Sequence, residues 1–185
     1  MLSFLGIEAV ISDDLNILKK ADRLFLPGVG HFVHGMNQLD SLGISDIIKE
    51  HALTVQRPIL GICLGMQLMT NFSEEDNVDS LGLIHAKTKK FQMQDKSLKI
   101  PHMGWNEVSW KIESLILNSL SEKPRYYFVH SYFVECNKKD DVLGTTHYGQ
   151  DFVSAFQHGN IIGMQFHPEK SHKFGMELLK NFTKL

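Results

Sequence analysis

The sequence predicts an α/β domain whose helices pack on a mostly parallel open sheet. Short apolar runs alternate with helical patterns, which is typical of strand–helix–strand units. Two of these runs, Arg23–Pro27 and Pro58–Ile62, are almost wholly apolar, as expected for strands buried inside a sheet. The 185 residues are 43% hydrophobic and 22% charged, so they hold enough apolar material for a single domain spanning residues 1–185.

Each element follows from a local pattern. Asp13–Ala21 begins with polar capping residues and carries apolar side chains on one side, which predicts a short helix. His158–Asn160 lies between two apolar runs and predicts a hairpin turn. His172–Leu185 keeps apolar residues at an i, i+4 spacing and predicts a C-terminal helix. The other predicted helices are His31–Leu39, Ile44–Ala52 and one that follows Cys63 and ends at about Asn71. The other predicted strands are Ile7–Ile11, Leu81–Ile84, Thr88–Gln92, Leu98–Ile100, Trp105–Trp110, Tyr126–Val134, Val142–Leu143, Phe152–Gln157 and Ile161–Phe166.

Charge and cysteine content exclude several classes of function. Lys and Arg number 19 and Asp and Glu number 21, so the net charge of −2 gives no general affinity for nucleic acid or anionic membranes. The two cysteines, Cys63 and Cys136, form no Cys-x-x-Cys pair and are too few for a disulfide framework. No secretory leader and no apolar run long enough to span a membrane is evident. A cytoplasmic protein in a reducing compartment is therefore expected.

Cys63 is the strongest candidate for a reactive side chain. It is the centre of Gly61–Gly65 (Gly-Ile-Cys-Leu-Gly), the thiol counterpart of the Gly-x-Ser-x-Gly nucleophile elbow. A helix that starts directly after the sulfur favours the reactive thiolate and offers N–H groups to an oxyanion. The alternative is a small buried apolar residue, and on this motif alone the two interpretations stand equal. Cys136 lacks such a turn and is interpreted as a packing residue.

A nucleophilic thiol needs a base, and His167 is the candidate. It ends an apolar strand within the sequence Gln-Phe-His-Pro-Glu at residues 165–169, and Glu169 is close enough to orient its imidazole. A second strand end, Pro27–Gly30 (Pro-Gly-Val-Gly), allows close backbone approach to a ligand, or is simply a tight turn. The sequence contains no phosphate-binding glycine loop and no cluster of metal ligands.

Taken together, these motifs resemble those of the class I (triad) glutamine amidotransferases. The matching stretches are Pro27–Gly30, Gly61–Gln67 and Gln165–Lys170. Pro101–Asn106 (Pro-His-Met-Gly-Trp-Asn) and Tyr127–Tyr132 (Tyr-Phe-Val-His-Ser-Tyr) narrow the match to the glutaminase subunits of imidazole glycerol phosphate synthase. The resemblance runs along essentially the whole chain and implies a three-layer, flavodoxin-like fold.

The resemblance also implies a role for each matching residue. Cys63 would be the nucleophile, His167 the general base and acid, and Glu169 its orienting partner. The other implied sites are an oxyanion hole from the backbone of Val29, Gly30 and Leu64, a glutamine pocket lined by Gln67, Glu75, Ser131 and Tyr132, and a partner surface with His102, Trp105, Asn106, Tyr127 and Lys170.

The implied reaction is hydrolysis of L-glutamine to glutamate and ammonia, with no metal or organic cofactor. The ammonia would pass to a (β/α)8-barrel cyclase, the partner in a heterodimer, which makes imidazole glycerol phosphate and AICAR in histidine biosynthesis. Three other interpretations stay open. They are a paralogous glutaminase serving a different synthase, for example in surface-sugar amidation; an inactive truncated copy; and a cysteine peptidase or redox-sensing thiol protein of related fold, against which residues 127–132 and 167–169 argue.

The N-terminus departs from the family pattern. Family members open with an apolar strand, a turn and a helix, whereas Leu2–Val10 resembles the end of that helix and the following strand. The first strand and most of the first helix are therefore expected to be missing, through a late start site or damage to the gene. Each buried backbone group left unpaired would cost about 1–3 kcal/mol. Restoring an upstream strand is expected to raise the melting temperature, and equal melting temperatures would contradict this.

Overall fold

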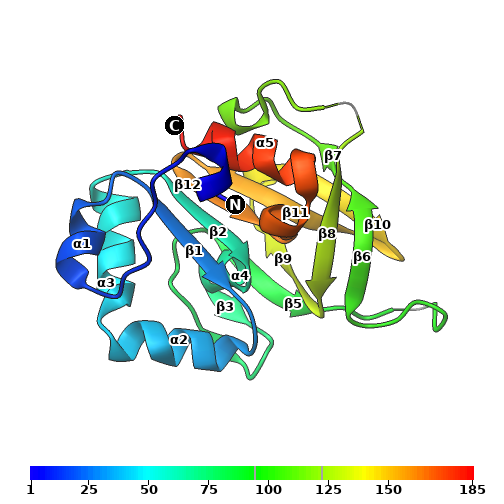
Figure 1. Ribbon diagram of the computed structural model, residues 1–185. Coiled ribbons are helices and arrows are strands. Elements are labelled where there is room, and N and C mark those ends of the chain that lie inside the picture. Colours follow the sequence, from blue (N-terminus) through cyan, green and yellow to red (C-terminus); the bar gives the residue numbers. More distant parts are fainter. Residues whose placement is uncertain (94, 122) are drawn as a thin grey trace.

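The chain forms a curled mixed sheet with helices packed against it (Figure 1). The computed structural model describes residues 1–93, 95–121 and 123–185. The helices are α1 (Leu15–Lys20), α2 (Phe32–Ser41), α3 (Ile44–Lys49), which continues as a π-helical turn (Glu50–Thr54), α4 (Leu64–Leu68) and α5 (His172–Phe182). The strands are β1 (Leu24–Gly28), β2 (Ile59–Cys63), β3 (Phe72–Ser73), β4 (Val78–Asp79), β5 (Ala86–Lys90), β6 (His102–Glu107), β7 (Ser109–Trp110), β8 (Arg125–His130), β9 (Tyr132–Cys136), β10 (Val142–Tyr148), β11 (Gln150–His158) and β12 (Ile161–Met164).

The part of the sheet that carries the elbow is parallel. Strands β1, β2 and β12 lie in this order, with Leu26 opposite Gly61 and Gly61 opposite Gly163. The hairpin turn at residues 158–160 reverses the chain, so β11 pairs antiparallel with β12. The order of the main sheet is β1-β2-β12-β11-β9-β5-β3-β4, with β10 on β11 and β7 on β10. The α/β fold class is confirmed, and the sheet is mixed because hairpins join several strands of its C-terminal half.

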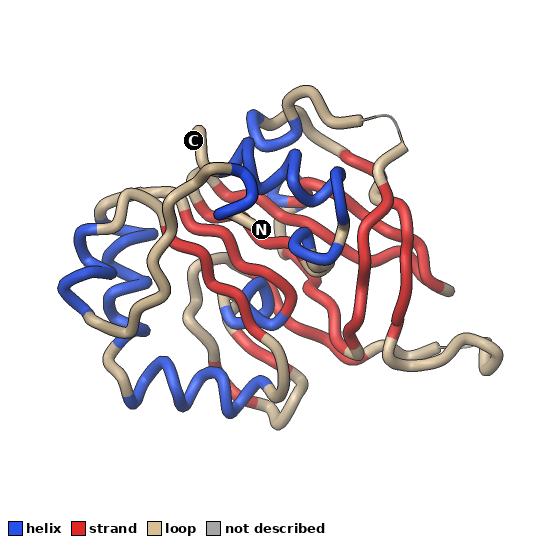
Figure 2. Tube along the Cα trace, viewed as in Figure 1, coloured by secondary structure: helices blue, strands red, loops and turns tan. Residues whose placement is uncertain are grey.

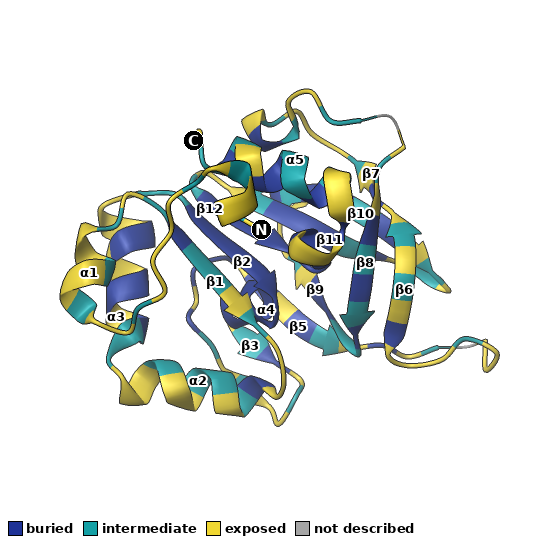
Figure 3. Cartoon of the chain, viewed as in Figure 1, coloured by how far each residue is buried: buried dark blue, intermediate teal, exposed yellow. Residues whose placement is uncertain are grey.

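Two apolar cores lie on opposite faces of this sheet. Along β2, Leu60 and Ile62 pack in the cluster that includes α5, whereas Ile59 packs in the cluster that includes α2 and α3. Side chains alternate between the faces of a strand, so the two clusters lie on opposite sides. Figure 3 shows β2 buried along its whole length. The result is the three-layer arrangement expected from the sequence.

A separate ribbon of two antiparallel strands stands beside the main sheet. Strand β6 pairs with β8, which places His102 opposite His130 and Trp105 opposite Tyr127. The ribbon is tied to the main fold through Tyr127, whose backbone forms a bridge with His167 just after β12. The pairing thereby brings together two stretches that are about 25 residues apart in sequence, Pro101–Asn106 and Tyr127–Tyr132.

Three predicted strands are wrong. Residues 7–11 form part of a loop that extends from Gly6 to Asp14 (Figure 2), and Val10 and Ile11 are exposed. A strand needs a neighbour for its backbone groups, and within the described residues β1 pairs on one side only, with β2. Residues 81–84 instead bond back to Leu68 and Met69 at the end of α4, and residues 98–100 follow a turn in which Leu98 donates to Asp95.

Two further predicted strands are each divided in the structure. Residues 126–134 form parts of β8 and β9, and residues 105–110 form part of β6 and all of β7; in both cases the first piece lies in the ribbon and the second in the main sheet. The remaining elements agree with the prediction within a few residues. The break between the second and third helices falls at Gly43, whose φ of 69° is in the left-handed region. Asp14 caps α1 by accepting a hydrogen bond from the Asn16 backbone, as its polar start predicts. Helix α4 ends at Leu68, earlier than predicted, because the apolar run at residues 81–84 supplies hydrogen bonds to its C-terminal carbonyls.

Candidate active site

Cys63 sits on a sharp turn between β2 and α4. Its backbone has φ 54° and ψ −111°, a conformation that a non-glycine residue adopts only under constraint. The glycines on either side allow this turn. A Cβ on Gly61 would lie 2.7 Å from the Gly65 carbonyl oxygen, and a Cβ on Gly65 would lie 1.7 Å from the Leu26 carbonyl oxygen. The elbow geometry expected from Gly-x-Cys-x-Gly is therefore present.

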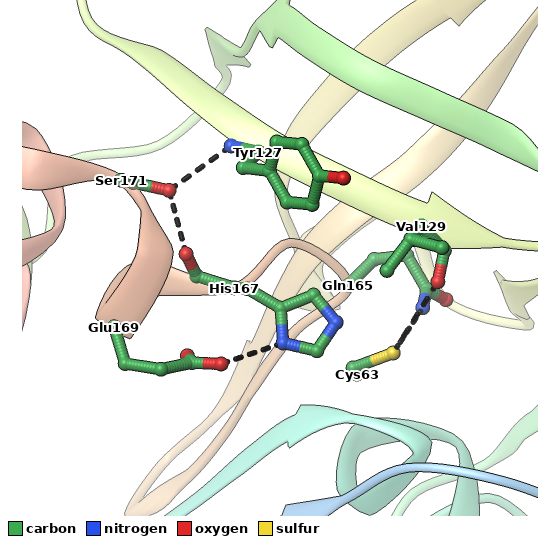
Figure 4. A network of polar contacts seen from close by, with 7 residues as sticks. All are labelled: Cys63, Tyr127, Val129, Gln165, His167, Glu169 and Ser171. Carbon is green, nitrogen blue, oxygen red and sulfur yellow. Dashed lines mark hydrogen bonds and ion pairs between the residues drawn. The ribbon is translucent and has the colours of Figure 1, made fainter.

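The structure brings Cys63, His167 and Glu169 together, as the sequence predicts. His167 Nδ1 lies 2.7 Å from Glu169 Oε1. The His167 side chain is 2% exposed and that of Glu169 is 42% exposed, so the carboxylate links a buried imidazole to the surface. His167 Nε2 is buried and, among the described residues, has no hydrogen-bond partner. Figure 4 shows this nitrogen on the side of the ring that faces Cys63, and the other nitrogen facing Glu169.

The backbone around His167 is held by strand β8. The His167 N–H donates to the Tyr127 carbonyl at 2.8 Å. The Ser171 hydroxyl donates to the His167 carbonyl at 2.6 Å and accepts from the Tyr127 N–H at 3.0 Å. The backbone N–H and C=O of His167 are thus both held. This fixes the position of its imidazole, as proton transfer by a base requires (Figure 4).

Electrostatics at His167 favour its charged form. Burial by itself lowers the pKa of His167, but Cys63 and the Glu169 carboxylate outweigh this and raise the pKa to about 9. Burial by itself raises the pKa of Glu169. The hydrogen bond from His167 and the charges of His167 and Lys170 lower it by more, so the net shift of the pKa is downward. At neutral pH the pair is therefore an imidazolium hydrogen-bonded to a carboxylate.

A pocket of about 350 Å³ opens beside Cys63. Its lining includes the residues expected for the oxyanion hole and the glutamine pocket, together with both ends of the thiol–imidazole pair: Val29, Gly30, Cys63, Leu64, Gln67, Glu75, Ser131, Tyr132 and His167. A larger groove of about 730 Å³ lies between Trp110 and Pro124, and its described lining contains neither Cys63 nor His167. The small pocket is consequently the candidate active site.

Gln67 is buried and tied to the pocket wall. Its amide nitrogen donates to the Tyr132 carbonyl and to Gln165 Oε1, both at 3.0 Å. Gln165 Nε2 in turn lies 3.8 Å from Cys63 Sγ, on the same side as the Val129 carbonyl, also at 3.8 Å. The sequence predicted no role for Gln165. It stands two residues before His167, and residues two apart in a strand face the same side, so its position indicated that its side chain would also face the site.

Glu75 lies at the mouth of the pocket, against the loop that follows β1. Its Oε2 accepts a hydrogen bond from the Phe32 N–H at the start of α2, at 3.2 Å, and its Oε1 lies 3.6 Å from His31 Nε2. The Gly30 backbone between β1 and α2 has φ 99°, which only glycine adopts readily. Glu75 therefore connects the expected substrate residues to the expected oxyanion turn.

Four of the five expected partner-surface residues are at least partly accessible, and three of them form one cluster. The Trp105 and Tyr127 rings lie 6.1 Å apart, and Lys170 Nζ lies 5.9 Å from the Tyr127 ring centre. His172, which the sequence did not suggest, stacks on Trp105 at 5.3 Å. Asn106 is partly buried farther along β6, and the fifth residue, His102, is 3% exposed and faces the core rather than the surface.

Two other features of the described chain bear on the chemistry. No group of three or more His, Cys, Asp or Glu side chains that could hold a metal ion occurs among the described residues. No described helix combines the length and apolar character that crossing a bilayer requires.

The buried His102 and His130 are expected to make stability depend on pH. Burial lowers the pKa of His102 to about 4 and that of His130 to about 3. The unfolded chain binds protons at these side chains near pH 6.5, whereas the folded chain does not, so the free energy of unfolding should fall as pH drops from about 6.5 toward 4. The expected slope is up to ~1.4 kcal/mol per pH unit for each imidazole. Urea denaturation between about pH 7 and pH 5 measures it.

The control is the variant His130→Asn, which should show a shallower slope in the same window. His167 adds no slope there, because its raised pKa leaves it protonated in both states below pH 6.5; its contribution is instead lost as pH rises toward about 9. An equal slope in the parent chain and in His130→Asn would contradict the neutral histidine pair.

Comparison with known proteins agrees with this fold. The family model of class-I glutamine amidotransferases matches residues 6–185, and the chain belongs to that family. Its relatives narrow the match further. The chain is 50% identical over 184 residues to imidazole glycerol phosphate synthase subunit HisH 2 of Methanococcus maripaludis, covering 100% of this chain and 91% of that protein. It is 44% identical over 185 residues to the subunit HisH 2 of Pseudomonas aeruginosa, again covering 100% and 91%.

Solved structures support the fold independently. A crystal structure of a glutamine amidotransferase superposes with a TM-score of 0.74 at 17% identity, covering 98% of this chain and 90% of that one. A glutamine amidotransferase from Thermotoga maritima superposes with a TM-score of 0.60 at 16% identity, covering 97% and 68%. At such low identity the likeness concerns the fold.

Proposed function

We propose that the protein hydrolyses the side-chain amide of L-glutamine and supplies the ammonia to a cyclase subunit of imidazole glycerol phosphate synthase, in the cytoplasm. The observation that carries the proposal is a thiol on a strained elbow, in one pocket with an imidazole that a carboxylate orients. Family membership and relatives named as synthase subunits support the same reaction.

In the first half of the reaction, Cys63 is the nucleophile and His167 carries the proton. The sulfur attacks the amide carbon of glutamine and a C–S bond forms. The negative oxygen of the tetrahedral intermediate accepts hydrogen bonds from the backbone N–H of Leu64, at the start of α4, and from that of the Val29–Gly30 turn. His167 Nε2 then gives its proton to the amide nitrogen, the C–N bond breaks, and ammonia leaves.

In the second half, neutral His167 accepts a proton from water as the water attacks the γ-glutamyl thioester. Collapse of this intermediate breaks the C–S bond and releases glutamate, and the thiolate and the imidazolium are restored. Glu169 holds the imidazole by the same Nδ1 hydrogen bond throughout, and the two reaction halves balance without a metal or redox cofactor.

The charges at the pocket mouth suit an amino acid substrate. Burial raises the pKa of Tyr132, and the negative charges of Glu75, Asp76 and Glu74 raise it further. The same carboxylates favour the α-ammonium group of glutamine. Gln67, Ser131 and Tyr132, which also line the pocket, supply polar groups for the rest of the substrate.

The exposed cluster on the β6–β8 ribbon is the proposed contact with the cyclase. Trp105 and Tyr127 belong to the aromatic residue types that carry much of the binding energy at protein interfaces, and Lys170 places a cation beside them. We place a (β/α)8-barrel partner there, with Asn106 at the edge of the contact and His102 beneath it.

The test measures glutamate and ammonia released from L-glutamine by the chain alone and after addition of the cyclase subunit from the same genome. We expect equal amounts of both products and a rate that rises more than about tenfold with the cyclase. L-Asparagine serves as the control amide and should be inert. Absence of glutamate with every barrel partner would overturn the proposal, and activity only with a different synthase would assign the chain to a paralogous pathway.

A further inference from the structure

A continuous chain of hydrogen bonds crosses the ribbon beneath the exposed cluster. It begins at Asn106 on β6, whose Nδ2 lies 3.4 Å from His102 Nε2. His102 Nδ1 lies 3.0 Å from His130 Nε2. His130 Nδ1 lies 2.7 Å from the Tyr132 carbonyl oxygen, on the wall of the active-site pocket. Both histidines are more than nine-tenths buried, so water does not compete for the bond between them.

The direction of every bond in this chain is determined. A carbonyl oxygen only accepts, so His130 Nδ1 carries a proton and, in the neutral ring, Nε2 accepts from His102 Nδ1–H. His102 Nε2 is then the acceptor for the Asn106 amide. That amide is itself fixed, because its Oδ1 accepts from the Glu107 N–H at 2.8 Å and its Nδ2 donates to the His147 carbonyl at 3.0 Å.

Both rings are neutral, as this arrangement requires. Burial lowers the pKa of both imidazoles far below neutral pH, and their mutual charge repulsion lowers the pKa of His130 further. His102 also lies between the Phe128 and Tyr148 rings, at 4.9 Å and 4.1 Å, so its plane is fixed by stacking as well as by hydrogen bonds.

The chain continues from the pocket wall to the sulfur. The Tyr132 carbonyl that accepts from His130 also accepts from Gln67, which holds Gln165, whose Nε2 faces Cys63 Sγ. Between His130 and this carbonyl lies Ser131, a pocket residue, and the Val129 carbonyl on the other side of His130 faces the sulfur. Moving the His130 ring would therefore disturb both groups that flank Cys63.

We propose that His102 and His130 are positioning residues, which hold residues 129–132 and the Gln67–Gln165 amide pair in place against Cys63. The inference rests on the proposed function for its kinetic consequence, but not for the geometry of the chain. Loss of the His102 donor leaves a buried acceptor on His130 without a partner, so the ring turns to find another donor and releases the Tyr132 carbonyl.

The first test reads the two imidazoles directly. Nitrogen-15 NMR of the full chain at neutral pH distinguishes which ring nitrogen carries the proton. We expect both His102 and His130 to be neutral and protonated at Nδ1. A proton on Nε2 of either ring would overturn the proposal, whatever the chain does with glutamine.

The second test uses substitutions at His102. His102→Phe keeps the stacking but removes the donor, whereas His102→Asn places an amide nitrogen near the position of Nδ1. In a Cys136→Ser background, so that only Cys63 reacts, we expect His102→Phe to slow alkylation by iodoacetamide about tenfold and to lower kcat for glutamine by a similar factor. His102→Asn should restore most of both.

The matched control is His51→Phe. His51 is 3% exposed and bonds to the Pro58 carbonyl at 3.1 Å, and it is absent from the pocket lining, so its loss should lower stability without changing alkylation. If His51→Phe slows alkylation as much as His102→Phe, or if His102→Phe reacts like the parent, the positioning role is refuted. If the parent chain alkylates as expected but releases no glutamate, the proposed function fails while the positioning role stands.

Discussion

Replacing His167 with asparagine is expected to lower kcat for glutamine hydrolysis by about 10³-fold or more. The imidazole has two tasks in the proposed mechanism: it holds the proton that Cys63 gives up, and it passes that proton to the departing ammonia. An asparagine amide fills much of the same space but acts neither as a base nor as an acid at neutral pH. Glutamate release by the cyclase-bound chain measures the effect.

The control for this prediction is His158→Asn. His158 Nδ1 lies 2.8 Å from Asp141 Oδ1, which closely matches the 2.7 Å contact of His167 with Glu169, but it lies on the β11–β12 hairpin. The substitution removes the same type of imidazole–carboxylate contact outside the pocket and should leave kcat unchanged. Retention of more than about one-tenth of the parent activity by His167→Asn would count against its role as base and acid.

Replacing Gly65 with alanine is expected to destabilise the folded chain by more than ~3 kcal/mol, or to prevent folding. A Cβ at this position would lie 1.7 Å from the Leu26 carbonyl oxygen and 2.8 Å from the Leu26 carbonyl carbon. Both atoms belong to the backbone of β1, which is hydrogen-bonded to β2 and cannot move independently. The methyl group therefore forces α4 away from the sheet, and the elbow with it.

Gly35→Ala in α2 is the matched control. Its Cβ would meet the end of the Leu68 side chain at 3.3 Å, which can shift, and alanine is a better helix former than glycine by about 1 kcal/mol. Urea denaturation should find this variant within ~1 kcal/mol of the parent. A similarly small effect of Gly65→Ala would mean that α4 packs less tightly on β1 than the structure has it.

Local signals predicted the elements whose conformation depends on neighbouring residues. The elbow at Cys63, the hairpin at residues 158–160 and the C-terminal helix were all readable, because glycine spacing and apolar periodicity act within a few residues. Apolar runs without such punctuation predict strands less well. Residues 7–11 and 81–84 look like strands, yet a strand is defined by its neighbour, and the apolar pattern does not say whether one is present.

The partner-surface residues show the same limit at the level of the site. Trp105, Tyr127 and Lys170 were named from a resemblance, and pairing of β6 with β8 brings them into one cluster. The resemblance also named His102, whose side chain the pairing turns inward. Side chains alternate between the two faces of a strand. His102 and Trp105, three positions apart on β6, therefore lie on opposite faces, one toward the core and the other toward solvent.

The sequence by itself predicted the proposed nucleophile, its base and the orienting carboxylate, because the types and spacing of these residues follow from the chemistry of a thiol on a turn and an imidazole beside a carboxylate. Tertiary structure decided how they are held. Ser171 and Tyr127 secure the backbone of His167, and a pair of neutral histidines supports the pocket wall near Cys63. Such contacts join residues far apart in the chain, and their geometry exists only when both apolar cores have formed around the sheet.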